Sequence, residues 1–359
     1  MAIEFAQRIR RIPVYPAAGG YAEQAPLVRL ASNESPYPPF AEVRAAIERA
    51  LNSLNRYPDP SSSILRERLS DRYEVPAARI AVGNGSCDIL LAAGEALLEP
   101  GAELVYAWPS FSVYPHLAAA SGARAITVGL DSEQRHDLPA MLREITVATR
   151  LAIVCNPNNP SSTALALAEI AAFLDEVPPH VCVIVDEAYC EFNLLGDPDS
   201  SIDLLHRHPN LALLRTFSKV YGLCGLRVGF ALCGSEALPQ AVNQVRQPFF
   251  CNALAQAAAV EALAHQDEVI ERVAKTVAER ISVTERLRAL GLRVADSQAN
   301  FCWLELGERD EDEVMRGLHE RGVLVRGGHA LGSDTPALRV TFGTPEENAR
   351  FLEALAEVL

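Results

Sequence analysis

The first residue type to consider is lysine, because the chain uses it at only two positions. Lysine and arginine together number 32, yet only Lys219 and Lys275 are lysines. Lys275 lies in a long amphipathic segment that is dense in charges, where a solvated helix face accounts for it. Lys219 follows an apolar run in LLRTFSKVYGLCGLRVGF. A half-buried lysine with a lowered pKa suits a Schiff base or a general base, and a snorkelling surface lysine is the weaker explanation here.

Groups that suit a phosphate lie on either side of Lys219 and in one distant turn. Thr216, Ser218 and Arg227 offer two hydroxyls and a guanidinium. In AVGNGSCDIL, the residues GNGS separate an apolar run from a helical pattern, so backbone amides at Gly85–Cys87 would lie at a helix N-terminus. The glycine spacing is neither that of a P-loop nor that of a dinucleotide fold, and an ordinary turn explains it equally well.

Two further segments end apolar runs with polar residues. VIVDEAYCEF delivers Asp186 and Glu187 to the end of a strand, followed by Tyr189. A carboxylate there can pair with a protonated ring nitrogen, and a phenol can bond a ring oxygen; a helix N-cap is an equally good explanation in isolation. VCNPNNPSS presents the amide of Asn159 in a rigid turn, which taken alone is most often only a turn.

The elements that must position these residues alternate along the chain. Short apolar runs flanked by turn signals are separated by helical patterns, which indicates an α/β fold with a mainly parallel sheet covered on both faces. In such sheets ligands bind at the carboxyl ends of the strands. The expected strands are 79–82, 103–107, 123–128, 151–155, 181–189 and 211–217.

Three regions are expected from this pattern. Residues 1–40 are rich in proline and glycine and read as an extended arm that is laid over a surface and joins the smaller domain to the large one. Residues 41–250 form the large domain. Residues 251–359 open with two long helical segments and continue with mixed strands and helices, which predicts a smaller α+β domain.

Composition narrows the function classes. The 359 residues are 49% hydrophobic and 22% charged, as in ordinary globular proteins, and the net charge of −14 disfavours nucleic acid as a partner. No run approaches the ~20 apolar residues of a membrane span, and the first residues lack the apolar core of a signal peptide, so we expect a cytoplasmic protein without membrane contact. The eight cysteines and eight histidines form no metal-ligand spacing, so no metal site is expected.

Taken together, the motifs are far more specific than any one of them. In chain order they are VYPAAGG, LASNESPYPPF, RYPDP, GNGS, WPSFSVYP, NPNNP, DEAYCEF, RTFSKVYGLCGLRVGF, SQANF and LRVTFGTPEEN. The sequence resembles the fold-type I, pyridoxal-phosphate (PLP)-dependent aminotransferases of class I/II, and most closely the histidinol-phosphate aminotransferase group. The resemblance implies a large domain with a mainly parallel seven-stranded sheet flanked by helices, a smaller α+β domain and an N-terminal arm.

The resemblance also implies roles for the residues that match. Lys219 would form the Schiff base with the cofactor and then move a proton, Asp186 would hold the pyridine nitrogen protonated, and Tyr189 and Asn159 would bind the ring hydroxyl. Phe111 would stack on the ring. The cofactor phosphate would be bound by the backbone amides of Gly85, Ser86 and Cys87 and by the side chains of Thr216, Ser218 and Arg227. Tyr57 from the other subunit of a homodimer would also reach it.

The substrates implied by the resemblance are an amino donor and 2-oxoglutarate in a ping-pong reaction. Arg339 and Arg326 would bind anionic groups of the substrate, and Tyr15 and Asn33 would close the pocket. Two arginines suit the dianionic phosphate of L-histidinol phosphate, the donor expected first, with histidine biosynthesis as the pathway. Aromatic amino acids such as phenylalanine or tyrosine are the alternative, because WPSFSVYP, RTFSKVYGL and SQANFCWLELG look at least as much like the aromatic branch.

Some positions depart from the pattern of the group. Cys87 replaces an acidic residue, NPNNPSS replaces NPNNPTG, and Phe111 stands where tyrosine is common. None removes a catalytic group, because backbone amides serve the phosphate and stacking needs only a ring. A PLP-dependent lyase or decarboxylase on the same fold, and a PLP-binding regulator without turnover, remain open alternatives.

Overall fold

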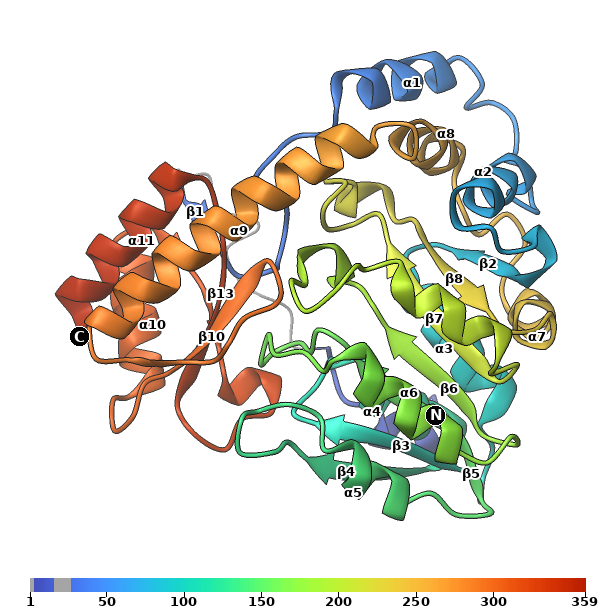
Figure 1. Ribbon diagram of the computed structural model, residues 1–359, viewed down its shortest axis with the longest axis horizontal. Coiled ribbons are helices and arrows are strands. Elements are labelled where there is room, and N and C mark those ends of the chain that lie inside the picture. Colours follow the sequence, from blue (N-terminus) through green and yellow to red (C-terminus); the bar gives the residue numbers. More distant parts are fainter. Residues whose placement is uncertain (1–2, 16–26) are drawn as a thin grey trace.

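A seven-stranded sheet dominates the computed structural model, which describes residues 3–15 and 27–359 (Figure 1). Strand β8 is antiparallel to both of its neighbours, and the other pairs in this sheet are parallel, which confirms the predicted mainly parallel sheet. In spatial order the strands are β2 (Ile80–Gly83), β8 (Gly229–Cys233), β7 (Leu211–Thr216), β6 (Cys182–Asp186), β5 (Thr149–Cys155), β3 (Glu103–Trp108) and β4 (Arg124–Gly129).

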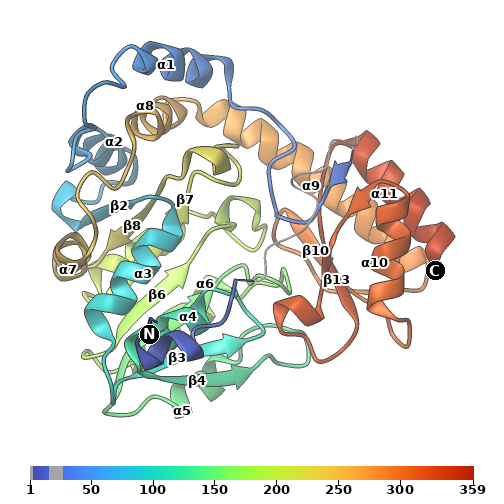
Figure 2. The same cartoon turned by 180° about the vertical axis from the view of Figure 1, so that it is seen from behind.

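The inner strands of this sheet are buried and largely apolar because helices cover both faces, whereas the edge strand β4 is mostly exposed or half-buried. Alternate residues of a strand point to opposite faces. In β6, Val183 and Val185 accordingly pack in one core cluster and Ile184 in the other. The first cluster includes side chains of α1, α2, α5, α6 and α8, and the second includes those of α3, α4 and α7. Figures 1 and 2 show these two helical layers from opposite sides.

The helices of the described residues follow the predicted alternation with the strands. They are α1 (Ala41–Leu51), α2 (Ser63–Tyr73), α3 (Ser86–Leu97), α4 (Tyr114–Ser121), α5 (Leu138–Arg143), α6 (Leu167–Glu176), α7 (Ala237–Val245), α8 (Ala253–Ala262), α9 (Gln266–Ala289), α10 (Glu311–Glu320) and α11 (Pro345–Val358). Short 3₁₀ helices are η1 (Gln7–Arg11), η2 (Ala77–Arg79), η3 (Cys190–Phe192), η4 (Ser200–His206), η5 (Cys224–Leu226) and η6 (His329–Leu331).

A smaller antiparallel sheet lies at the other end of the molecule, with α9, α10 and α11 beside it (Figure 1). Its strands in spatial order are β12 (Arg326–Gly327), β13 (Ala337–Thr341), β10 (Phe301–Glu305) and β9 (Arg293–Val294). Helix α9 runs from the large sheet's helices to this smaller sheet (Figure 1). The division into residues 1–40, 41–250 and 251–359 stays a prediction.

The N-terminal arm is only partly extended. We expected an extended arm over residues 1–40, and within it η1 forms a short 3₁₀ helix that lies near α4 (Figure 2). Farther along, β1 (Val28–Arg29) pairs in parallel with β11 (Val323–Leu324), so residues 28–29 lie beside residues 323–324. The second half of the VYPAAGG motif lies outside the described residues.

Candidate active site

A cavity of about 490 Å³ opens where the carboxyl ends of β5, β6 and β7 meet the smaller sheet and the arm. It collects residues that are far apart in sequence, as expected for ligand sites of parallel sheets. Most of the sequence-predicted site residues line it: Tyr15, Asn33, Ser86, Cys87, Phe111, Asn159, Asp186, Tyr189, Thr216, Ser218, Lys219, Arg227, Arg326 and Arg339. Gly85 lies just behind the wall as the N-cap of α3, and Tyr57 lies elsewhere on the surface of the chain.

Lys219 follows β7 and lies between the large sheet and the arm. Its Nζ donates a hydrogen bond to the backbone oxygen of Asn33 at 3.0 Å and lies 5.4 Å from the centre of the Tyr189 ring. Burial lowers the pKa of Lys219 to about 8, and the nearby Arg339 guanidinium lowers it further in the same direction. A fraction of Lys219 is therefore neutral near physiological pH, as a Schiff base or a general base requires.

The two lysines offer a direct test of this environment. At pH 7, roughly a tenth of Lys219 is neutral, whereas the exposed Lys275, paired with Glu271 at 2.6 Å, has a raised pKa and is less than about one part in a thousand neutral. We expect reductive methylation of the cofactor-free protein with formaldehyde to modify Lys219 well before Lys275. Peptide mass spectrometry measures both sites in one sample, and faster modification of Lys275 would contradict the lowered pKa.

Asp186 ends β6 and is nearly inaccessible to solvent. Burial raises its pKa to about 6, against the effect of hydrogen bonds from the Tyr114 hydroxyl at 2.8 Å and the Ala188 amide at 3.3 Å. The ring of Phe111 contacts Tyr114 edge-on, with centroids 5.7 Å apart. Tyr114 was missed from the sequence, although it stands three residues after Phe111 in the same motif.

A hydrogen-bond chain joins the arm, the large sheet and the smaller sheet around the Tyr189 hydroxyl. The side-chain amides of Asn33 and Asn159 donate to that oxygen at 3.1 and 3.4 Å. Arg339 in turn donates to the Asn159 side-chain oxygen at 2.6 Å and to the backbone oxygen of Ala31 at 2.7 Å. The Arg339 guanidinium is thereby fixed in orientation inside the cavity, as recognition of a carboxylate requires.

The residues predicted to hold a phosphate come together at the N-terminus of α3. Gly85 has φ of 82°, and a Cβ there would overlap the Arg227 guanidinium. Arg227 donates to the Ser218 hydroxyl at 3.4 Å, and the Ser218 amide donates to the Thr216 hydroxyl at 3.0 Å. Hydroxyls, a guanidinium and the first amides of a helix thus converge on one corner, and these donors fit a phosphate.

The cavity wall is mainly cationic, unlike the chain as a whole. The wall carries the cationic groups of Lys219, Arg227, Arg326 and Arg339 against the carboxylates of Glu34 and Asp186, although the whole chain has a net charge of −14. Arg326 and Arg339 are directly opposite each other on the antiparallel strands β12 and β13. Like charges in such cross-strand positions repel, so the pair favours an anionic ligand beside both side chains in the cavity.

A buried ion network lies behind Asp186 and was also missed from the sequence. Arg215 precedes Thr216 on β7 and Glu187 follows Asp186, so both side chains point away from the cavity. Arg215 donates to Glu187 at 2.8 Å and to Asp199 at 2.6 Å. In the sequence, Arg215 stands next to Thr216 and Glu187 stands next to Asp186. Only the pairing of β6 with β7 shows that these two charged side chains are close together.

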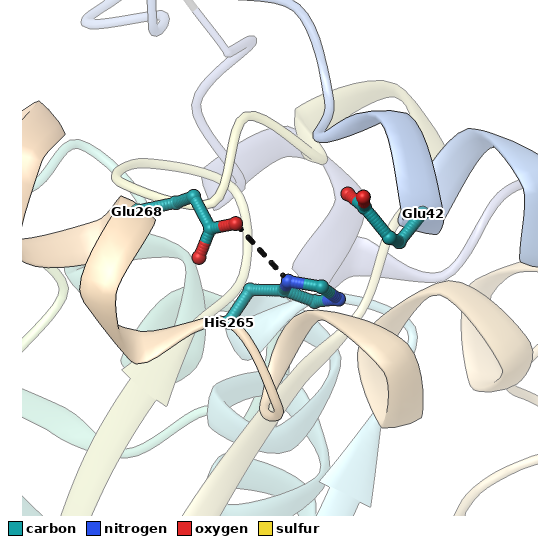
Figure 3. Close-up of side chains that lie close together, drawn as sticks. All are labelled: Glu42, His265 and Glu268. Carbon is teal, nitrogen blue, oxygen red and sulfur yellow. Dashed lines mark hydrogen bonds and ion pairs between the residues drawn. The ribbon is translucent and has the colours of Figure 1, made fainter.

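The described residues also bear on disulfides, metal sites and membrane spans. All eight cysteines are free. One group there could hold a metal ion, formed by Glu42, His265 and Glu268 near the start of α9 (Figure 3). Glu261 lies 3.3 Å from Nε2 of His265 and Glu268 lies 3.3 Å from Nδ1, so both ring nitrogens of this histidine contact carboxylates. Within residues 3–15 and 27–359, every helix is too short or too polar to span a bilayer.

Comparisons with known proteins agree with this geometry. The family model for aminotransferase class I and II matches residues 25–355. An aromatic amino acid aminotransferase of Thermobifida fusca is 47% identical over 326 residues, covering 90% of this chain and 88% of the relative. One of the same name from Streptomyces coelicolor is 43% identical over 347 residues, covering 96% and 95%.

A solved structure extends the likeness to the whole fold. The histidinol-phosphate aminotransferase of Sinorhizobium meliloti, crystallised with pyridoxal 5′-phosphate, superposes with a TM-score of 0.87 at 26% identity, covering 100% of this chain and 98% of that one. With a family match over nearly all of its length and relatives above 40% identity, the chain belongs to the class I and II aminotransferases, a family of PLP-dependent transferases.

Proposed function

We propose that this aminotransferase moves the amino group of an aromatic L-amino acid to 2-oxoglutarate. The observation that carries the proposal is that a half-buried amine and a fixed guanidinium, Lys219 and Arg339, line one cavity. Tyr15, Phe111 and Leu331 add apolar surface to the same wall. An amino acid with one carboxylate and a large apolar side chain matches these groups, and the names of the T. fusca and S. coelicolor relatives favour this donor class.

Pyridoxal 5′-phosphate is the cofactor that the donor set fits. Its phosphate would be held by the N-terminus of α3 with Ser218 and Arg227, its nitrogen by Asp186, its hydroxyl oxygen by Tyr189 and Asn159, and its ring face by Phe111. When bound, the cofactor would supply an electron sink that takes up the electron pair of the substrate's Cα–H bond. Arg339 orients the substrate carboxylate, and Nζ of Lys219 takes the Cα proton and later returns it on the cofactor side.

Burial of these groups matters for the proton movements. The pKa of Tyr189 is raised by burial, so its phenol stays protonated and can donate to an oxygen anion. Lys219, with its pKa lowered to about 8, can accept a proton and release it within a narrow pH range. The two domains and the arm keep bulk water away from Asn33 and Asp186, which are both buried.

L-Histidinol phosphate, the donor expected first from the sequence, remains the second candidate. Arg326 favours it, because a second arginine suits a dianionic phosphate. The same arginine also suits the second carboxylate of 2-oxoglutarate, and the curated relatives named above are aromatic amino acid aminotransferases. The balance therefore favours an aromatic donor.

The experiment that separates these donors is a half-reaction measured without acceptor. The PLP-loaded protein is mixed with L-phenylalanine or with L-histidinol phosphate, and the visible absorbance of the loaded protein is followed. We expect rapid conversion by phenylalanine, with one equivalent of phenylpyruvate formed per site. Conversion by histidinol phosphate alone would overturn the aromatic assignment, and release of ammonia or carbon dioxide would indicate a lyase or decarboxylase.

Replacing Arg326 tests how one cavity accepts two unlike substrates. In Arg326→Gln we expect the half-reaction with phenylalanine to change little, because Arg339 takes its single carboxylate. The return half-reaction with 2-oxoglutarate should slow roughly 10- to 100-fold, the effect of losing one charge-assisted hydrogen bond to its second carboxylate. Arg293→Gln, an exposed arginine on the same small sheet, is the control. Equal losses in both half-reactions would contradict this assignment.

We also propose a homodimer in which Tyr57 serves the partner's cofactor phosphate. The Tyr57 side chain is 81% exposed in the single chain and stacks on Phe249, with centroids 4.4 Å apart. The nearby side chains of Leu51, Leu54 and Ile64 are also exposed, so a second copy would cover an apolar surface.

The prediction for this interface uses two variants of one residue. Tyr57→Phe keeps the ring but removes the hydroxyl, so PLP should bind roughly tenfold more weakly while the dimer persists. Tyr57→Ala removes the stacking as well and should also weaken the dimer. Equilibrium dialysis and sedimentation measure the two effects. Unchanged PLP affinity in Tyr57→Phe would count against the shared site.

A further inference from the structure

Tyr114 occupies a buried position between two groups that the proposed function assigns to the cofactor ring. It is the first residue of α4, and its side chain is fully buried. Its hydroxyl donates to Oδ2 of Asp186 at 2.8 Å, and its ring meets Phe111 edge-on at 88°. The Tyr114 amide also donates to the backbone oxygen of Phe111 at 3.0 Å.

We propose that Tyr114 is a positioning residue that keeps the Asp186 carboxylate ionised and oriented toward the cofactor nitrogen while it holds Phe111 in place. This inference rests on the proposed cofactor site. The hydroxyl reaches Oδ2 of the carboxylate, and the Ala188 amide reaches Oδ1. With one donor on each oxygen, the plane of the carboxylate is fixed before any ligand arrives.

The energetics of Asp186 explain why such a donor is needed. A carboxylate buried this deeply favours its neutral form, and burial is what raises the pKa of Asp186 to about 6. The Tyr114 hydroxyl opposes that rise by donating to the ionised form. Burial raises the pKa of Tyr114 itself well above its usual range, so the phenol remains a donor at all pH values of interest.

The other titratable groups around Asp186 come from several elements. They are Cys87 of α3, Cys155 of β5, Glu187 and Tyr189 after β6, and Lys219 after β7. Burial raises the pKa of Cys87 to about 11 and of Cys155 to about 12, so neither thiol ionises near neutrality. Lys219 does titrate near neutral pH, but it does so equally in the wild type and in a Tyr114 variant, so it does not distinguish the two proteins.

The test uses Tyr114→Phe and measures binding of pyridoxamine 5′-phosphate to the cofactor-free protein by calorimetry. This ligand carries no aldehyde, so the bond to Lys219 does not contribute to its affinity. We expect the ratio of variant to wild-type Kd to approach about ten below pH 6 and to shrink toward one as pH rises and Asp186 ionises in both proteins. Titration of the ligand itself cancels in this ratio.

Tyr106→Phe is the matched control. Tyr106 lies on β3, is also buried, and packs edge-on against Tyr114 with centroids 5.9 Å apart. Its substitution removes a hydroxyl from the same aromatic cluster without removing the donor to Asp186, so the affinity should stay at the wild-type value. Thermal unfolding of both cofactor-free variants shows whether each folds, and Tyr114→Phe preserves the ring that packs on Phe111.

The outcomes separate this inference from the proposed function. Unchanged affinity in Tyr114→Phe at every pH would overturn the role of Tyr114 alone. A loss that is the same at every pH would overturn the claim that Tyr114 keeps Asp186 ionised, and a loss shared equally by Tyr106→Phe would show a purely structural role and overturn the inference. Failure of the wild-type protein to bind pyridoxamine 5′-phosphate would refute the cofactor site itself, and the inference with it.

Discussion

Replacing Lys219 with alanine is expected to abolish amino-group transfer and to leave the fold intact. In the proposed mechanism the residue supplies both a nucleophilic amine and the base that moves the Cα proton, so its loss should lower turnover by roughly 10⁴-fold or more. Transfer from L-phenylalanine to 2-oxoglutarate, followed as phenylpyruvate by chromatography, measures the effect. Lys219 donates only to backbone oxygens of the arm, so the large sheet loses no hydrogen bond in the variant.

The composition of the chain provides an unusually clean control. Lys275, the only other lysine, is exposed on α9 and pairs with Glu271, so Lys275→Ala should turn over at the wild-type rate. Reduction of the PLP-loaded protein with borohydride should leave the mass of the cofactor on the peptide that contains residue 219. Substantial turnover by Lys219→Ala, or the cofactor on the Lys275 peptide, would refute the proposed role.

Much of the cavity could be predicted from the sequence because a polar residue directly after an apolar run marks the end of a strand. Asp186 and Thr216 each follow a run of apolar residues, and parallel strands bring their carboxyl ends to one edge. The motif resemblance then related distant segments such as Phe111 and Arg339. Both kinds of signal are local in sequence, and the structure places these residues around the same cavity.

What escaped prediction depends on register and on side-chain packing. Tyr114 looks like an ordinary core aromatic until α4 directs its hydroxyl to Asp186, some seventy residues away. The opposition of Arg326 and Arg339 follows from the pairing of β12 with β13, which no periodicity in such short strands could fix. The proposed role of Tyr57 lies beyond a single chain, because it needs the partner subunit.

The second large expected effect concerns the ion network behind Asp186. Arg215 is almost completely buried and donates to Glu187, to Asp199 and to the backbone oxygen of Pro198, the last at 2.6 Å. Arg215→Met leaves the buried carboxylate of Glu187 without its cation, whereas the half-buried Asp199 keeps Arg72 as a partner. We expect this to lower the free energy of unfolding by about 3–5 kcal/mol, the cost of breaking one side of a buried pair.

Urea unfolding of the PLP-loaded protein at constant protein concentration measures this loss. Arg150→Met, which replaces an exposed arginine on the neighbouring β5, should change stability by less than about 0.5 kcal/mol. The double variant Glu187→Met/Arg215→Met should recover part of the loss, because it removes an uncompensated charge together with its former partner. A double variant less stable than Arg215→Met would contradict this explanation.

The dependence of the Arg215→Met effect on pH follows from Asp199. Burial acts to raise the pKa of Asp199, but Arg215 and Arg72 outweigh burial and hold it below its usual value. A carboxyl with a lowered folded-state pKa stabilises the protein above its unfolded pKa, and this contribution disappears as pH falls. The stability gap between wild type and Arg215→Met should therefore narrow below about pH 4. A gap that stayed constant or widened on acidification would show that lost packing, rather than lost charge pairing, causes the destabilisation.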